Sequence, residues 1–222
     1  MRRREFLVIN AGAITGLLGA TLARELSALT TESSGQVRVP LRFFTASEAR
    51  IVEAACERIF PADAKSPGAK AAGVVIYIDR QLAGPYGRDK YRYTKPPFFE
   101  SVPEHGYQGR DTPRQVYRAG VRALGDFASI SPEEQDNRLA DIEGTRFFEL
   151  LKAHTIEGVF SDPMHGGNAN LVGWKLIGFP GPRMSYRDDI DRHFGVAYRP
   201  APASLQQILG RALKPWEDER SE

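Results

Sequence analysis

The stretch FSDPMHGGNANLVGWKLIGFPG, residues 160–181, decides how the rest of the chain must fold. Its five glycines and two prolines interrupt the backbone too often for one regular helix or strand. They favour turns in which the backbone is left-handed or closely packed. Two large rings, Trp174 and Phe179, nevertheless lie among those glycines. Either the domain's own core or another protein must cover these rings.

The composition is that of one ordinary globular domain. The chain has 222 residues, of which 41% are hydrophobic, enough for a single core. It carries 30 basic and 28 acidic residues, but four of the basic and two of the acidic ones lie in positions 1–28, which leaves 26 of each in the body. A neutral body gives no electrostatic reason to bind nucleic acid or an anionic membrane surface. We therefore expect no nucleic-acid partner, and membrane association that is at most indirect.

The N-terminus carries the clearest local motif. Arg3 and Arg4, followed after one residue by Phe6 and Leu7, resemble the twin-arginine export signal. The run that follows is rich in glycine and alanine, and is too short and too weakly apolar for a convincing membrane span. We therefore interpret residues 1–28 as a signal segment that directs the folded protein to the periplasm. The alternative is an ordinary amphipathic N-terminal helix.

The twin-arginine route carries folded proteins, usually ones that have already acquired a cofactor, yet this chain has no recognisable cofactor motif. It contains no G-x-G-x-x-G after a strand-like run, no phosphate-binding loop and no C-x-x-C-H haem motif. Its single cysteine, Cys56, cannot by itself hold an iron–sulfur cluster. We infer that no cofactor is bound by this chain and that a partner carries it.

The pattern of apolar residues predicts an irregular all-α domain with long loops over residues 45–216, after a linker at 29–44 and before an acidic tail at 217–222. Cys56 lies on the apolar stripe of the first helix, which favours a buried, inert thiol over an intersubunit disulfide. Helix starts are indicated by Thr45 with Glu48, Thr112-Pro113, Ser131-Pro132 and Thr145. With these starts, the expected helices cover residues 45–60 and 69–82, three segments that begin at 112, 131 and 145, and short segments at 171–177, 186–194 and 204–213.

The segment 84–111 is long, irregular and rich in aromatic and basic residues. Structureless loops of this length are uncommon inside compact domains unless they bind something. Tyrosine, phenylalanine and arginine are enriched at protein interfaces, and the acidic residues interspersed here argue against single-stranded nucleic acid. The segment is either part of an interface or folded back over its own domain. Its candidate contact residues are Tyr91, Tyr93, Phe98 and Phe99.

Residues 160–168 and 173–181 closely resemble the signature of the gluconate 2-dehydrogenase subunit 3 family. The resemblance extends to residues 44–61 and 79–84 and to the twin-arginine leader, although Val8 stands where the family usually has a basic residue. Members are small subunits of membrane-associated, flavin-dependent sugar and sugar-acid dehydrogenases. The resemblance implies a non-catalytic partner of a large subunit that carries FAD, often with a multi-haem cytochrome c as a third subunit. It thus implies a periplasmic complex held at the inner membrane.

If the signature lies at the subunit boundary, its exposed residues belong to the interface. The candidates there are Asp162, His165, Asn168, Trp174 and Phe179. Each also has an ordinary structural role available. Asp162 and Asn168 can cap turn amides, His165 can make a loop hydrogen bond, and Trp174 can belong to the core.

The rival interpretation is an exported enzyme that uses a metal ion bound by His154, Asp162 and His165, with His193 as a further candidate. Imidazole and carboxylate groups suit zinc or iron. Their spacing, however, matches no strong metal motif, and Asp162 and His165 lie on either side of a proline turn. A serine nucleophile at Ser161 lacks the strand-turn-helix setting that such a residue needs.

Overall fold

The computed structural model describes residues 40–93, 95–99 and 102–210. The chain divides into two compact units, 1–40 and 41–222, and the fold described here is that of the second. The described part of unit 41–222 has nine α-helices and four short 3-10 turns but no strand, which confirms the all-α prediction. None of the described helices is long and apolar enough to cross a membrane. The export motif at residues 3–7 lies outside the described residues.

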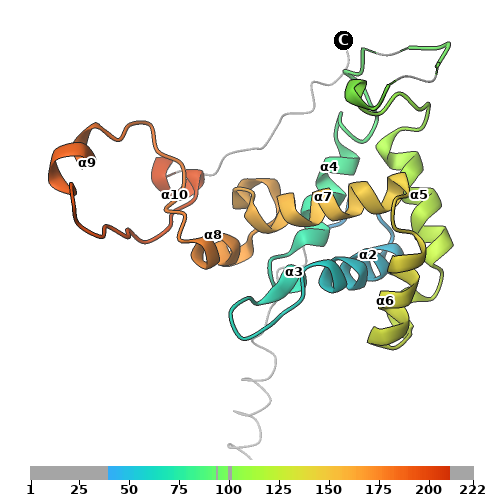
Figure 1. The fold of residues 1–222 in the computed structure, drawn as a ribbon, viewed down its shortest axis with the longest axis horizontal. Coiled ribbons are helices and arrows are strands. Elements are labelled where there is room, and N and C mark those ends of the chain that lie inside the picture. The colour runs from blue at the N-terminus through green and yellow to red at the C-terminus, as the bar shows by residue number, and fades with distance from the viewer. Residues whose placement is uncertain (1–39, 94, 100–101, 211–222) are drawn as a thin grey trace, which may run out of the picture. The chain divides into compact units, whose positions relative to one another are not determined.

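Figure 1 shows the helices in chain order. Their bounds are α2 (Ala46–Ile59), α3 (Gly68–Ala71), α4 (Val74–Ala83), α5 (Pro113–Leu124), α6 (Pro132–Asp141), α7 (Arg146–Phe160), α8 (Val172–Ile177), α9 (Arg187–Arg192) and α10 (Leu205–Leu209). The 3-10 turns are η1 (Pro103–His105), η2 (Phe127–Ser129), η3 (Pro163–His165) and η4 (Ala169–Leu171).

Helix α2 begins as its sequence predicts. The Thr45 hydroxyl accepts the Glu48 amide, and the Glu48 carboxylate accepts the Thr45 amide at 2.8 Å, so both halves of the capping box are present. The stripe that contains Cys56 faces the core, and Cys56 is 1% exposed. Burial raises the pKa of this thiol to about 12, so it stays protonated and unreactive. The prediction of a buried thiol is confirmed.

The helix expected over residues 69–82 is in fact two helices. Gly73 adopts φ +69°, a left-handed conformation that ends α3 and starts α4 in a new direction. The break leaves the Ala72 carbonyl free to accept the Ala169 amide at 3.0 Å. The apolar periodicity of the segment runs through the break, so the pattern alone did not reveal it.

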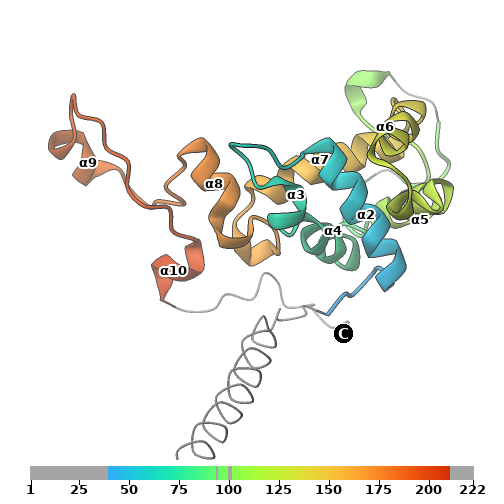
Figure 2. The ribbon, with the colours of Figure 1, turned by 90° about the horizontal axis from the view of Figure 1, so that it is seen from below.

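Helix α7 is the central element. It packs against α4, α5 and α2, and Figure 2 shows α4, α2 and α5 beside it. The helix starts expected at residues 112, 131 and 145 are confirmed. Helix α5 ends at Leu124, and Phe127 enters the core from the following turn, η2. At the α5–α7 crossing the ring of Phe147 lies where a side chain at Gly120 would be.

The packed chain begins at Leu41, before α2. Phe44 is 6% exposed and belongs to the core. The segment is fixed by Asp79 of α4, which is 1% exposed and accepts the backbone amides of Arg42, Phe43 and Phe44 at 2.7, 3.0 and 2.8 Å. Three charge-assisted bonds compensate for the burial of this carboxylate.

Candidate functional site

The signature region, residues 160–181, is held together by its own hydrogen bonds. Asn168 is fully buried and has φ +47°. Its Nδ2 donates to the Ser161 carbonyl at 2.9 Å, and its Oδ1 accepts the Gly173 amide at 2.8 Å. An asparagine tolerates the left-handed conformation and can bridge two turns in this way. Asn168 is therefore a structural lock within the chain.

Trp174 lies in the core and Phe179 lies at its edge. The Trp174 side chain is 4% exposed, and its Nε1 donates to the Phe160 carbonyl at 2.7 Å. The Phe179 ring meets it edge to face at a centroid distance of 5.0 Å and stays 37% exposed. The sequence left open what covers these two rings. The domain's own core covers Trp174, but it covers Phe179 only in part.

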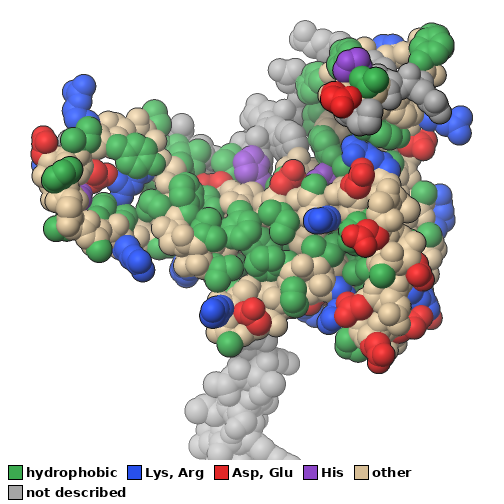
Figure 3. All heavy atoms as spheres, viewed as in Figure 1, with side chains coloured by type: hydrophobic (Ala, Val, Ile, Leu, Met, Phe, Trp, Pro, Cys, Tyr) green, Lys and Arg blue, Asp and Glu red, His purple; other side chains and the backbone are tan. Residues whose placement is uncertain are grey.

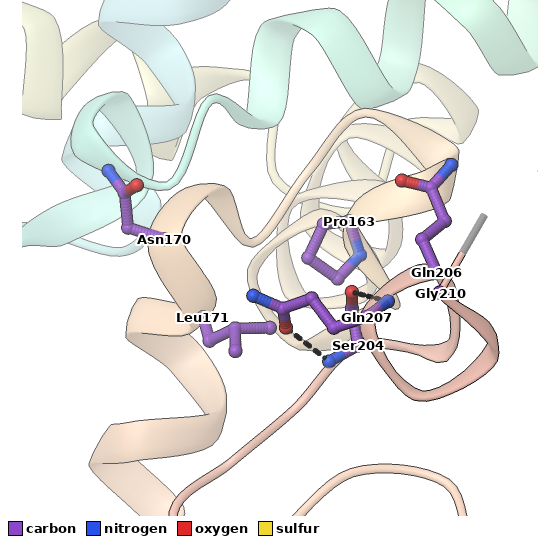
Figure 4. Close-up of a pocket in the computed structure, with 7 residues that line it drawn as sticks. All are labelled: Pro163, Asn170, Leu171, Ser204, Gln206, Gln207 and Gly210. Atoms are coloured by element: carbon purple, nitrogen blue, oxygen red, sulfur yellow. Dashed lines mark hydrogen bonds between the residues drawn. The ribbon is translucent and has the colours of Figure 1, made fainter. Parts of the chain in front are cut away.

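Asp162 joins the signature region to the C-terminal segment. Its Oδ1 accepts the Met164 amide at 3.0 Å, and its Oδ2 accepts the Leu205 amide at 2.8 Å. An open hollow of about 590 Å³ lies beside this junction. Figure 4 shows Pro163 and Leu171 of the signature on the side of α10, where the Ser204 and Gln207 capping bonds are drawn, while the Asn170 side chain points away from α10. Its seven lining residues include no titratable side chain, so the hollow offers no acid or base.

The aromatic loop, residues 84–111, is built around Arg92. This side chain donates to the Gly109 carbonyl at 2.5 Å, pairs with Asp89 at 3.2 Å, and lies 5.3 Å from the ring centres of Phe98 and Tyr107. Beneath the loop is a hollow of about 190 Å³, lined in part by Arg92 and Arg146. The outer aromatic side chains are unprotected: Tyr91, Tyr93 and Phe99 are 74%, 84% and 74% exposed.

The two groups of candidate interface residues lie at opposite ends of α7. Tyr107 of the aromatic loop lies under Arg146, the first residue of α7, at 4.5 Å. The signature contacts Phe160, the last residue of α7, through Trp174. A helix of this length spans roughly 20 Å, so the structure does not bring the two groups into one compact site. One partner would have to reach along α7 to contact both.

His154 forms a buried network that the sequence analysis did not anticipate. Its Nδ1 and Nε2 lie 2.8 Å from the hydroxyls of Tyr117 and Tyr86 respectively. Burial, with a contribution from the nearby Arg146 charge, lowers the pKa of His154 to about 4. Burial likewise raises the pKa of Tyr86 to about 12. A neutral imidazole between two neutral phenols donates to one and accepts from the other, so both ring nitrogens are occupied.

The residues of the metal hypothesis are thus committed to other bonds or lie apart. His154 is bonded to two tyrosines, Asp162 caps two backbone amides, and the half-buried His165 follows Asp162 in the turn η3. Across the ranges that the structure describes, no three His, Cys, Asp or Glu side chains come close enough to hold a metal ion. This geometry offers the metal-enzyme interpretation no support.

The family model of gluconate 2-dehydrogenase subunit 3 matches residues 46–181, which run from the start of α2 to the end of the signature. Neither a curated protein nor a solved structure matches the chain. The family description concerns one subunit of a multi-subunit dehydrogenase. Because the match covers more than half of the 222 residues, the chain belongs to the gluconate 2-dehydrogenase subunit 3 family.

Proposed function

We propose that this chain is the accessory small subunit of a flavin-dependent dehydrogenase that oxidises a sugar or sugar acid. The family membership carries this proposal, because a third subunit implies other subunits with which it assembles. The subunit binds and stabilises the large subunit and contributes no catalytic group. Oxidation takes place on the FAD of the large subunit. Where the complex also contains a haem-bearing cytochrome subunit, that subunit passes the electrons on.

The chemistry of the described residues supports an accessory role. Buried polar side chains that the sequence offered as functional residues make their bonds within the fold. His154, offered as a metal ligand, bonds two tyrosines, and Asn168, offered as an interface residue, bridges two turns. Their partners are backbone groups and tyrosine hydroxyls of the same domain.

The interface is proposed on the exposed members of the two residue groups. These are Tyr91, Tyr93 and Phe99 with the half-buried Phe98 in the aromatic loop, and Phe179 with the half-buried Asp162 and His165 at the signature. Asn168 and Trp174 are left out because the domain itself buries them. Obligate subunit interfaces typically bury about 2,000 Å² or more, an area that suits a surface running along α7.

We further propose that the complex leaves the cytoplasm on this chain's signal. Arg3, Arg4, Phe6 and Leu7 form the only twin-arginine motif of the sequence, and the route accepts folded cargo. The large subunit would load FAD in the cytoplasm, bind this chain, and be exported with it. The assembled dehydrogenase would then reside in the periplasm, attached to the inner membrane through its other subunits.

The export role is tested by changing Arg3 and Arg4 together to lysine in cells that express the whole complex. We expect dye-linked dehydrogenase activity to accumulate in the cytoplasm and to disappear from the periplasm. Since the substitutions lie outside the domain of residues 45–216, activity per mole of complex in the cytoplasm serves as the control. Periplasmic activity equal to that of the wild type would show that another chain provides the signal.

A further inference from the structure

Residues 182–202 form a loop, here named the C-terminal loop, that is closed at its base. The Ala203 amide donates to the Pro180 carbonyl at 3.1 Å. Gly181 has φ +100°, and a Cβ atom on it would lie 2.0 Å from the Ala203 carbonyl oxygen, so glycine is required there. The bond from Leu205 to Asp162 then fixes the returning chain to the signature. The base of the loop is therefore held by backbone contacts.

The inside of the C-terminal loop is polar. Arg183 pairs with Asp189, whose other oxygen lies 3.0 Å from His193 Nδ1. His193 stacks on the ring of Tyr198 at a centroid distance of 3.6 Å. The Arg183 guanidinium lies 5.6 Å from that same ring. A salt bridge and a ring stack thus give the loop a fixed shape with hardly any apolar core.

The same loop exposes several large apolar side chains. Met184 is 98% exposed and Phe194 is 89% exposed, and three neighbours are more than half exposed: Tyr186, Ile190 and Val196. Figure 3 shows hydrophobic side chains on the outside of the loop that carries α9, interspersed with charged ones. Exposed apolar groups gathered in one segment mark surfaces that another molecule covers.

We propose that the C-terminal loop is the arm with which this subunit recognises its own large dehydrogenase subunit. The inference rests on the proposed function, which supplies the partner. The loop also follows directly in sequence on Ile177 and Phe179, two apolar residues that are 58% and 37% exposed. An arm whose shape is already fixed loses little conformational entropy on binding, so its apolar anchors contribute more to affinity.

The charge of the loop favours an apolar protein surface as its partner. It contains four arginines and three aspartates, so it is close to neutral. Binding to an anionic lipid surface relies on clustered Lys and Arg side chains. Here Arg183 is already paired within the loop. The matching surface on the large subunit is therefore an uncharged, apolar groove that accepts Met184 and Phe194.

The position of the loop suggests what it determines. The family match ends at residue 181, and the loop begins at the next residue. The family match thus covers the helical body and stops where the arm begins. We infer that the arm contributes to partner choice, so that this subunit binds its own large subunit more tightly than that of a related dehydrogenase.

The arm is tested by changing Met184 and Phe194 together to serine in a tagged full-length chain that is expressed in its native cell. Flavin that co-purifies per chain reports the bound large subunit. We expect at least a tenfold loss, the scale of a disrupted interface hot spot. The control is Ala140→Ser, on an exposed residue of α6 that lies outside the proposed interface, which should retain its flavin. Unchanged thermal unfolding of both variants excludes misfolding.

A second measurement identifies what covers the arm. A photo-crosslinking phenylalanine analogue in place of Phe194 should give an adduct with the flavin-bearing large subunit, while the same analogue at Ala140 of α6 should give none. Adducts with lipid, with a second copy of this chain or with residues 1–39 would overturn the inference. The inference would also be overturned if the double serine variant retained as much flavin as the wild type. The proposed function would stand in that case. A wild-type chain without flavin would overturn both.

Discussion

At the scale of single residues, the fold depends on buried polar groups whose partners are backbone amides. Asp79 is the clearest case, because one carboxylate of α4 fixes three consecutive amides ahead of α2. The sequence placed Asp79 within a family motif but gave no indication of its role. Its partners lie 35 to 37 residues away, and no local pattern reveals a contact at that separation.

We expect Asp79→Ala to lower the free energy of unfolding by about 3 kcal/mol or more, because three buried amides lose a charged acceptor. Chemical denaturation of the full chain measures this loss. The control is Asp136→Asn, on an exposed carboxylate that pairs with Arg58, and it should change stability little. Equal effects of the two substitutions would contradict a special role for Asp79.

His154 should make the stability depend on pH. Burial keeps its pKa near 4 in the folded chain, below the ordinary value of 6.5, so the unfolded chain binds the proton more readily between these values. Stability is then greatest above pH 6.5, falls as the pH drops towards 4, and levels off below it. The total loss is about 3 kcal/mol.

Denaturation at several pH values between 4 and 7 checks this prediction. In His154→Gln the loss with falling pH should shrink markedly, while His165→Gln, which leaves both tyrosine bonds in place, should retain it. A wild-type chain equally stable at pH 4.5 and pH 7 would show that the imidazole is not held neutral by its surroundings.

At the scale of elements, the helices pack so closely that some glycines have no room for a side chain. Gly120 of α5 is one, because a Cβ atom there would lie 2.1 Å from Cγ of Phe147 in α7. We expect Gly120→Ala to destabilise the fold by roughly 2 kcal/mol, despite the better helix propensity of alanine.

A smaller side chain at position 147 should relieve the clash with a Cβ atom at position 120. In a background of Phe147→Leu, the additional change Gly120→Ala should cost much less than it does alone, as a double-mutant cycle by chemical denaturation would show. Additive effects would mean that the two helices do not meet at this point.

The C-terminal loop should open independently of the domain. Asp189 pairs with Arg183 and lies 3.0 Å from His193 Nδ1, so Asp189→Asn removes the charge that holds the loop. Hydrogen exchange of the amides in α9 should accelerate, while exchange in α4 and α7 stays as in the wild type. A uniform acceleration, or none at all, would contradict a locally stapled loop.

Across the whole molecule, the sequence predicted the features that local residue patterns determine. It missed those that depend on contacts between residues far apart in the chain. The all-α class, the capping box at Thr45 and the burial of Cys56 followed from spacing and are confirmed. The break at Gly73 did not, because the apolar periodicity runs through it, and the bond that the free Ala72 carbonyl accepts comes from the distant signature region. Trp174 could not be assigned to the core from sequence alone, since its cover comes from Phe160 and Phe179.

The C-terminal loop shows the same limit on the functional side. Its sequence predicted a short helix near 186–194, and α9 is there. The pairing that gives the loop its shape depends on contacts between Arg183, Asp189, His193 and Tyr198, which no helical periodicity encodes. The family match covers the helical body and suggests the class of partner, whereas the arm could be inferred only from the exposure and contacts of its side chains.

The central claim is that this chain serves a dehydrogenase without performing the oxidation itself. The most direct test is to express the full chain without other subunits, and then measure its bound flavin and its dye-linked oxidation of gluconate and of sugars. We predict neither flavin nor turnover from the chain alone, and both once the large subunit is co-expressed. Stoichiometric flavin or measurable turnover in the isolated chain would contradict the account.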